Sequence, residues 1–135
     1  MSPLEPLLSS PYVQMMRVRF DGHGDELTAI LPYADTLVGN PLIPALHGGA
    51  IGAFMEITAS AALLAGTRLA ALPKPIDVSV DYLRPARPQD VYARGIITRQ
   101  GARVANVRVE AWQDRRAAPV AALHGHFLIK PEGEG

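Results

Sequence analysis

One apolar stretch, residues 48–66, constrains the fold of this chain more than any other feature. Its spacing predicts one long helix, and Glu56 is its only ionisable side chain. Apolar residues occur all round this helix, and such a helix is stable in water only when other elements cover it. Because a carboxylate sits at its centre and charged, strand-like segments follow, we expect a helix buried in a domain, not a membrane span.

The rest of the chain predicts strands that cover the helix. Residues 14–21 and 25–32 alternate between apolar and polar side chains around the turn sequence Asp21-Gly22-His23-Gly24, which predicts a hairpin. Residues 33–46 read as a loop. Four more strands are expected after the helix, at residues 75–83, 90–99, 104–113 and 118–130. The short turns between these strands predict antiparallel pairing.

This order of elements predicts an α+β fold in which a curled antiparallel sheet of about six strands wraps around one long central helix. With 135 residues the chain is long enough for a single core. We therefore expect one domain over residues 1–135, with residues 1–12 as an N-terminal lead-in and residues 131–135 as a frayed tail.

Composition excludes several function classes. The 13 basic residues balance the 13 acidic ones, so no net charge draws the chain to nucleic acid or to an anionic membrane. The absence of cysteine excludes disulfides and thiolate nucleophiles. His124 and His126 could bind zinc as neighbours on one strand face, but no further ligands are evident, so no metal and no cofactor are expected. The N-terminus lacks a signal-peptide pattern, and a cytoplasmic location is expected.

The start of the predicted helix is suited to chemistry at a carbonyl group. Gly48 and Gly49 carry no side chains that would cover the free backbone N–H groups of the first turn. The helix dipole adds partial positive charge at that point. These groups can stabilise the negative charge that develops on a carbonyl oxygen. The alternative is that the glycine pair only allows close packing of the helix start.

The spacing of these groups predicts a dimer. Gly48 and Glu56 lie eight positions apart, about 12 Å along a helix, and the N–H groups of the first turn point away from Glu56. One chain cannot place both against one carbonyl carbon. Two antiparallel helices side by side can, so we expect a two-fold homodimer with active sites across its interface. The alternative for Glu56 is a structural carboxylate bonded to hydroxyl groups across that interface.

The turn His47-Gly48-Gly49 followed by Glu56, taken together with the strand end Tyr82-Leu83-Arg84-Pro85-Ala86, resembles the hotdog-fold acyl-CoA thioesterases, and in particular their phenylacetate-degradation-type branch. The resemblance covers about residues 15–130. The first motif is a His-Gly-Gly turn at residues 47–49 with an acid nine positions after the histidine, Glu56, and with Asn40 upstream. The second is the strand end Tyr82-Leu83-Arg84-Pro85-Ala86.

The resemblance implies a role for each residue of the first motif. Glu56 matches the catalytic carboxylate, and Gly48 matches the residue whose N–H polarises the thioester carbonyl. His47 is implied to shape the turn, and Asn40 to contact the thioester or the attacking water. Ser60 stands where some relatives place a hydroxyl beside the carboxylate. Asn40 departs from the pattern, because it lies seven residues before the histidine where the family usually has six.

The expected reaction is hydrolysis of an acyl-CoA, aryl or medium-chain, to the free acid and coenzyme A. Glu56 acts either as a general base on water or as a nucleophile that forms an anhydride. Coenzyme A is then part of the substrate. Arginine suits phosphate geometry, although each arginine alone could be plain surface. The expected substrate contacts are Gly49, Tyr82, Arg84, Arg87 and Arg103. The resemblance also implies that dimers pair into tetramers.

Two rival functions stay open at this point. A hotdog-fold dehydratase or hydratase would carry a histidine in the loop before the helix, and residues 35–46 contain none. A non-catalytic acyl-CoA-binding module would keep the fold without turnover. Binding alone does not require a carboxylate at the centre of an apolar helix, so Glu56 argues against this second rival.

Overall fold

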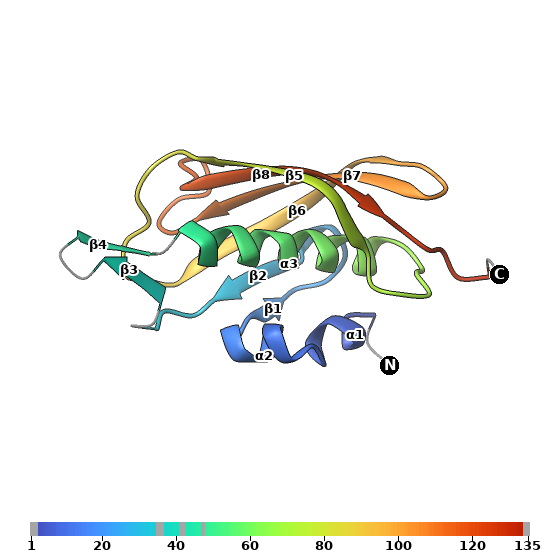
Figure 1. Ribbon diagram of the computed structural model, residues 1–135, viewed down its shortest axis with the longest axis horizontal. Coiled ribbons are helices and arrows are strands. Elements are labelled where there is room, and N and C mark those ends of the chain that lie inside the picture. The colour runs from blue at the N-terminus through green and yellow to red at the C-terminus, as the bar shows by residue number, and fades with distance from the viewer. Residues whose placement is uncertain (1–2, 35–36, 41–42, 47, 134–135) are drawn as a thin grey trace.

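The structure, a computed structural model, describes residues 3–34, 37–40, 43–46 and 48–133. A six-stranded antiparallel sheet curls around one long helix (Figure 1), so the predicted α+β hotdog architecture is confirmed. The helices are α1 (Glu5–Leu8), α2 (Pro11–Met16) and α3 (Gly48–Gly66), with a 3₁₀ turn, η1 (Gly24–Glu26). The strands are β1 (Arg19–Asp21), β2 (Thr28–Leu31), β3 (Val38–Asn40), β4 (Ile43–Leu46), β5 (Lys74–Tyr82), β6 (Val91–Gln100), β7 (Val104–Trp112) and β8 (Ala121–Leu128).

The order of strands leaves β5 at one edge of the sheet. The order is β1-β2-β6-β7-β8-β5, and β3 and β4 form a separate pair. β6, β7 and β8 are a meander of successive antiparallel strands, as their short turns predict. β5 returns to pair with β8, from Lys74 opposite Leu128 to Tyr82 opposite Ala121. Among the described residues, β5 has no strand on its other side.

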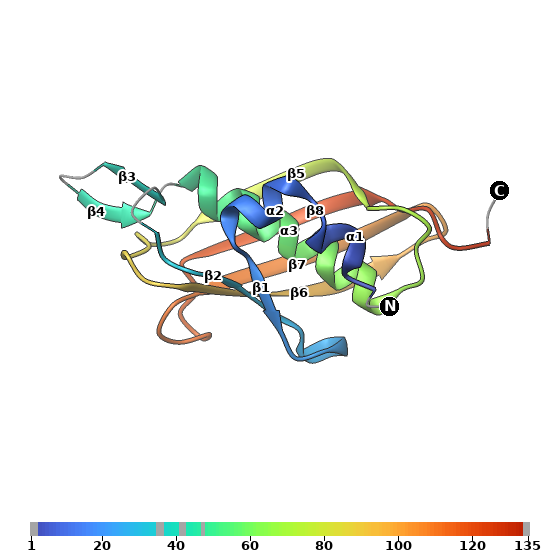
Figure 2. The ribbon, with the colours of Figure 1, turned by 90° about the horizontal axis from the view of Figure 1, so that it is seen from below.

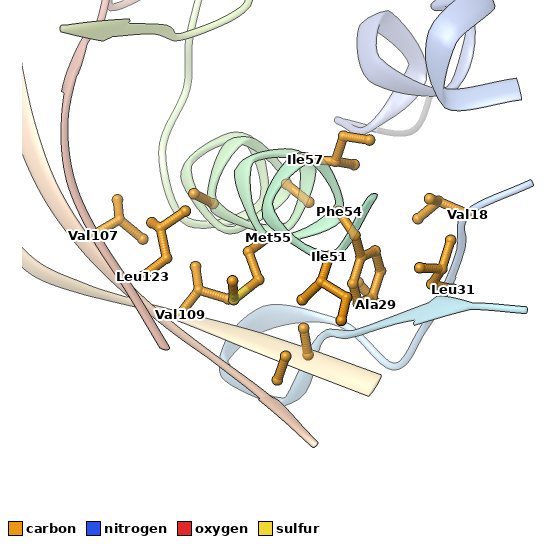
Figure 3. Packing of buried hydrophobic residues seen from close by; sticks show 14 of the residues in the cluster. Val18, Ala29, Leu31, Ile51, Phe54, Met55, Ile57, Val107, Val109 and Leu123 are labelled. Carbon is orange, nitrogen blue, oxygen red and sulfur yellow. The ribbon is translucent and has the colours of Figure 1, made fainter. Parts of the chain in front are cut away.

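The core lies between α3 and the concave face of the sheet. Phe54, Met55 and Leu63 of the helix are fully buried. In Figure 3, Met55 points toward Val109, while Phe54 points toward β2. Burial of each such side chain stabilises the fold by about 1.5–3 kcal/mol. α3 is long and apolar enough to cross a membrane by length and composition alone, but half of that window is buried inside the domain. Packing as the core helix accounts for its apolar composition.

The N-terminal segment is helical where the sequence pattern predicted a strand over residues 14–21. Proline suits the first position of a helix, and Pro11 starts α2. Val13 and Met16, three positions apart, are buried in the core. Arg17 ends the helix in the left-handed region, with φ 59°. Only Arg19–Asp21 remains as a strand, and Figures 1 and 2 show α1 and α2 crossing α3 on the side away from the sheet.

Two further expectations about irregular segments were wrong. The segment 33–46, predicted as a loop, contains the paired strands β3 and β4. The C-terminal tail, predicted to fray from residue 131, is still paired there: Leu69 forms a bridge with Pro131, and the Glu132 N–H donates to the Arg68 carbonyl at 3.0 Å. The pairing of the tail is long-range, and the local sequence does not encode it.

Candidate active site

Glu56 lies on a face of α3 that the described residues leave partly open. Gly49 is exposed, and Ala53, Glu56 and Ser60 are half-buried. Their spacing of three or four residues places them on one side of the helix. An apolar helix of this kind calls for cover by the curled sheet or by a second subunit, and among the described residues the sheet and the N-terminal helices leave this face partly uncovered. We call residues 49, 53, 56 and 60 the open stripe.

The carboxylate of Glu56 is available for bonding in the part of the chain that the structure describes. It forms no hydrogen bond and no salt bridge with the described residues. The Ser60 hydroxyl, one turn further on, is also unbonded within the described part. Among the described residues the carboxylate therefore has no structural partner, and it is available to a ligand or a second subunit.

Tyr82 joins the end of β5 to the start of α3. Its hydroxyl donates to the Gly48 carbonyl at 2.8 Å. Its ring lies 3.4 Å from where a Cβ on Gly48 would stand, and its hydroxyl oxygen lies 3.2 Å from the corresponding point on Gly52. The glycines therefore let Tyr82 lie directly against the first turns of the helix. The sequence names Tyr82 as a substrate contact. It does not predict the hydrogen bond to Gly48, which lies 34 positions away in the chain.

The open stripe and the open edge of the sheet adjoin one another. Tyr82, the last residue of β5, touches Gly52, which is one helical turn before Glu56. Ile76 and Leu83, on or just after β5, are more than half exposed, as is Tyr82 itself. A free strand edge flanked by exposed apolar side chains is a surface that favours pairing with another chain.

The three predicted phosphate-binding arginines do not gather in one chain. Arg84 lies just beyond β5, at the end where α3 begins, and its side chain is exposed. Arg87 is close by in sequence, but its guanidinium pairs with the Asp114 carboxylate. Arg103 belongs to the β6–β7 turn, at the end of the sheet where β5 begins. Arg84 and Arg103 therefore lie at opposite ends of the sheet.

Of the two remaining candidates from the sequence, the structure describes only Asn40. His47 lies outside the described residues. The backbone of Asn40 ends β3 and pairs with β4 opposite Ile43 and Ala45.

Two cavities lie away from Glu56. One, of about 330 Å³, is lined by residues of α3, β1, β2 and β6 that include Thr58, Ala62 and Gly95, and it opens on the side of α3 opposite Glu56. The other, of about 320 Å³, lies on the convex face of the sheet, where His126 Nδ1 is 2.6 Å from Asp77 Oδ1. Within the described ranges, no three His, Asp or Glu side chains gather as metal ligands.

The comparisons with known proteins agree with this architecture. The model of the family described as the thioesterase superfamily matches residues 44–120, which include all of α3 and the residues around Glu56. A crystal structure of a protein from Chromobacterium violaceum is 42% identical over 96% of this chain and 90% of its own, with a TM-score of 0.73. Among proteins of curated function, no match was found.

Two more distant structures share the fold. A phenylacetic acid degradation-related protein from Ralstonia eutropha is 21% identical, with a TM-score of 0.78 over 93% of this chain and 96% of its own. A protein from Bacillus halodurans, crystallised with CoA, is 18% identical, with the same TM-score over 94% of this chain and 87% of its own. At these identities the likeness is one of fold alone.

Proposed function

Because the chain belongs to the thioesterase superfamily, we propose that it hydrolyses acyl-CoA thioesters to the free acid and coenzyme A, at sites shared between two subunits. The observation that carries this proposal is the unengaged carboxylate of Glu56 on the open stripe. An ionised carboxylate without a partner on an otherwise apolar helix is costly to desolvate. Its presence at this position therefore points to a functional role. The CoA bound to the Bacillus halodurans protein of the same fold supports the choice of substrate class.

Two open features that adjoin each other support the proposed dimer. Pairing of β5 with β5 of a second copy about a two-fold axis is antiparallel, and it extends the sheet across both subunits. The two α3 helices then run antiparallel, side by side. Their open stripes carry Gly49, Ala53 and Ser60, whose small side chains let the helices approach closely. This arrangement brings Glu56 of one subunit toward Gly48 of the partner subunit. Pairing of such dimers into tetramers stays a prediction.

In the proposed mechanism, the Gly48 N–H donates to the thioester carbonyl oxygen as negative charge develops on it. Glu56 takes a proton from a water molecule whose oxygen attacks the carbonyl carbon, and the thiolate of CoA leaves and is protonated. In the alternative route, the carboxylate itself attacks the carbonyl carbon, the C–S bond breaks and the thiolate of CoA leaves and is protonated, and water then hydrolyses the resulting anhydride to the free acid and the Glu56 carboxylate. Tyr82 holds the Gly48 carbonyl and thereby fixes the direction of the first turn.

The first test is a hydrolysis screen over short, medium, long and aryl acyl-CoA substrates that follows thiol release. Glu56→Gln keeps the size of the side chain and removes the base, and we expect it to lower kcat at least about a hundredfold. Glu110→Gln is the matched control, since Glu110 lies on β7, where it pairs with Arg108, and makes no part of the proposed site. Full turnover in Glu56→Gln would remove this residue from the mechanism. Tight acyl-CoA binding with no thiol release from any substrate would contradict a hydrolase and leave a binding module.

A second test asks whether the sites are shared. Gly48 is the first residue of α3, where proline is tolerated, so Gly48→Pro removes the proposed N–H donor without breaking the helix. We expect Glu56→Gln and Gly48→Pro each to be inactive. In a mixed dimer, the Glu56 of one subunit and the Gly48 of the other form one intact site. Co-expression in equal amounts should restore about a quarter of wild-type activity if subunits pair at random. No restoration would show that each site lies within one chain.

A further inference from the structure

The cavity behind α3 plays no part in the proposed hydrolysis. It lies between the β1–β2 hairpin, α3 and β6, and it has a volume of about 330 Å³; we call it the rear cavity. Thr58 and Ala62 line it, and their positions two and six residues after Glu56 place them on the far side of the helix. A cavity of about 150 Å³ holds benzene, and small-molecule sites begin at about 300 Å³. The rear cavity therefore has room for a ligand of about a dozen non-hydrogen atoms.

The space exists because the β1–β2 hairpin separates from β6. β2 pairs with β6 only where Ala29–Leu31 lie opposite Val91–Ala93. On the N-terminal side of β2 the chain forms η1, which packs against α3, and Figure 2 shows this tip of the hairpin turning away from β6. As a result, residues 94–97 of β6 have no described strand on that side.

The side chains that line the rear cavity are uncharged. Phe20, Leu27 and Ile97 supply apolar surface from three different strands or turns. Thr58 is the polar side chain of the described lining, and its hydroxyl already donates to the Phe54 carbonyl at 2.8 Å. No ionisable residue belongs to the lining as far as the structure describes it. Such an interior favours an uncharged and mainly apolar ligand.

The open edge of β6 supplies polar groups to the same cavity. In an antiparallel sheet, successive residues direct their N–H and C=O groups alternately to the two neighbouring strands. Between Arg94 and Ile97, half of these groups therefore point to the side without a strand, and Gly95, Ile96 and Ile97 of this stretch line the cavity. An amide group of a ligand carries one donor and one acceptor, and it can bond to such an edge as a neighbouring strand does.

We propose that the rear cavity binds an uncharged, mainly apolar small molecule that carries one amide group. Charge at the mouth argues against an anionic ligand. Asp21 and Glu26 stand exposed on the hairpin tip, on either side of Gly24, which lines the cavity. The Arg94 Nε–H is occupied, since it donates to the Thr28 hydroxyl oxygen at 2.8 Å. Carboxylates and phosphates are therefore disfavoured, and the proposal does not depend on thioester hydrolysis.

The test titrates the ¹⁵N-labelled protein with N-propylbenzamide, an uncharged amide of about a dozen non-hydrogen atoms, and follows the backbone amides by NMR. We expect the signals of Gly24, Gly66 and Gly95 to shift and to saturate with a Kd of about 1 mM or lower. The signal of Gly49, on the open stripe, should not move. The carboxylate 4-butylbenzoate, of similar size, should bind at least about tenfold more weakly.

Two variants locate the ligand. Ala62→Met fills the cavity from the helix and should weaken binding at least about tenfold. Phe20→Ala removes a wall at the hairpin and should weaken it several-fold. The matched control is Ala118→Met, which adds the same side chain at a half-buried position in the β7–β8 loop and should keep the affinity within about twofold. Dispersion of the NMR signals shows whether each variant is folded.

Thermal unfolding gives a second readout. A ligand that binds the folded state raises the unfolding temperature as its concentration increases. We expect this rise with N-propylbenzamide in the wild type and in Ala118→Met, and a much smaller one in Ala62→Met and Phe20→Ala.

Four results would overturn the proposal: no shifts in the wild type, shifts confined to the open stripe, equal affinity in Ala62→Met and Ala118→Met, or equal affinity for the amide and the carboxylate. None of them bears on thioester hydrolysis. Conversely, binding that is lost only in the cavity variants supports the rear cavity even if no thioester is hydrolysed.

Discussion

Gly95 is the position at which a single methyl group should move α3, the helix that carries Glu56. It lies on β6 and faces α3. A Cβ at this position would stand 2.8 Å from the Cβ of Ala62 and 3.4 Å from the Thr58 carbonyl oxygen. Carbon atoms in contact prefer about 3.5–4.0 Å, so the overlap is about 0.7 Å or more. The Ala62 methyl group has no rotamer to escape into, and relief requires that α3 and β6 separate.

The magnitude follows from two opposing effects. Overpacking of this kind costs about 1–3 kcal/mol. Alanine also restricts the unfolded chain more than glycine does, which returns about 0.5–1 kcal/mol. We therefore expect Gly95→Ala to lower the free energy of unfolding by about 0.5–2 kcal/mol, as measured by urea denaturation. Activity should fall further than stability, because a displacement of about 1 Å in the helix that carries Glu56 can cost up to a hundredfold in rate.

Gly66→Ala is the matched control. A Cβ there meets only the Cδ1 of Ile97, at 3.0 Å, which is the movable tip of a flexible side chain. Gly66 is also the last residue of α3, where alanine favours the helix. We expect this variant to be as stable as the wild type or slightly more stable. If Gly95→Ala is no less stable than Gly66→Ala, the tight contact between helix and sheet is not what limits this position, and the reasoning is refuted.

Two further predictions concern the site and the core. Tyr82→Phe keeps the ring and removes the hydrogen bond to Gly48; because Tyr82 is half exposed and water can replace its hydroxyl, the loss of stability should be only about 0.5 kcal/mol. Its kcat for thioester hydrolysis should nevertheless fall about two- to tenfold, and an unchanged kcat would show that Tyr82 does not position the helix start. Phe54→Ala should cost about 3–5 kcal/mol in urea denaturation, since Phe54 is fully buried. Tyr12→Ala, at a half-exposed position, should cost less than about 0.5 kcal/mol, and similar losses in both variants would contradict this assignment of the core.

The sequence alone determined the architecture, because its strongest signals are local and periodic. The apolar run from residue 48 to residue 66 specifies α3, and its observed bounds match the predicted ones. Alternation and turn residues specify β5 to β8 within a few positions. The local pattern failed at residues 14–16, where alternating Met16 and Val18 suggested a strand. The segment is helical because Pro11 favours the start of a helix, and because a helix buries Val13 and Met16 together in the core.

The sequence also named Glu56 and Gly48, since a lone carboxylate and a glycine helix start stand out in any apolar run. What it could not provide was the surroundings of these residues. The face of α3 that stays open, the hydrogen bond from Tyr82 to Gly48 and the free edge of β5 all depend on how segments that are far apart in the chain come together. Their positions depend on how the sheet curls and which strand takes its edge. Long-range pairing decides this, and no local propensity encodes it.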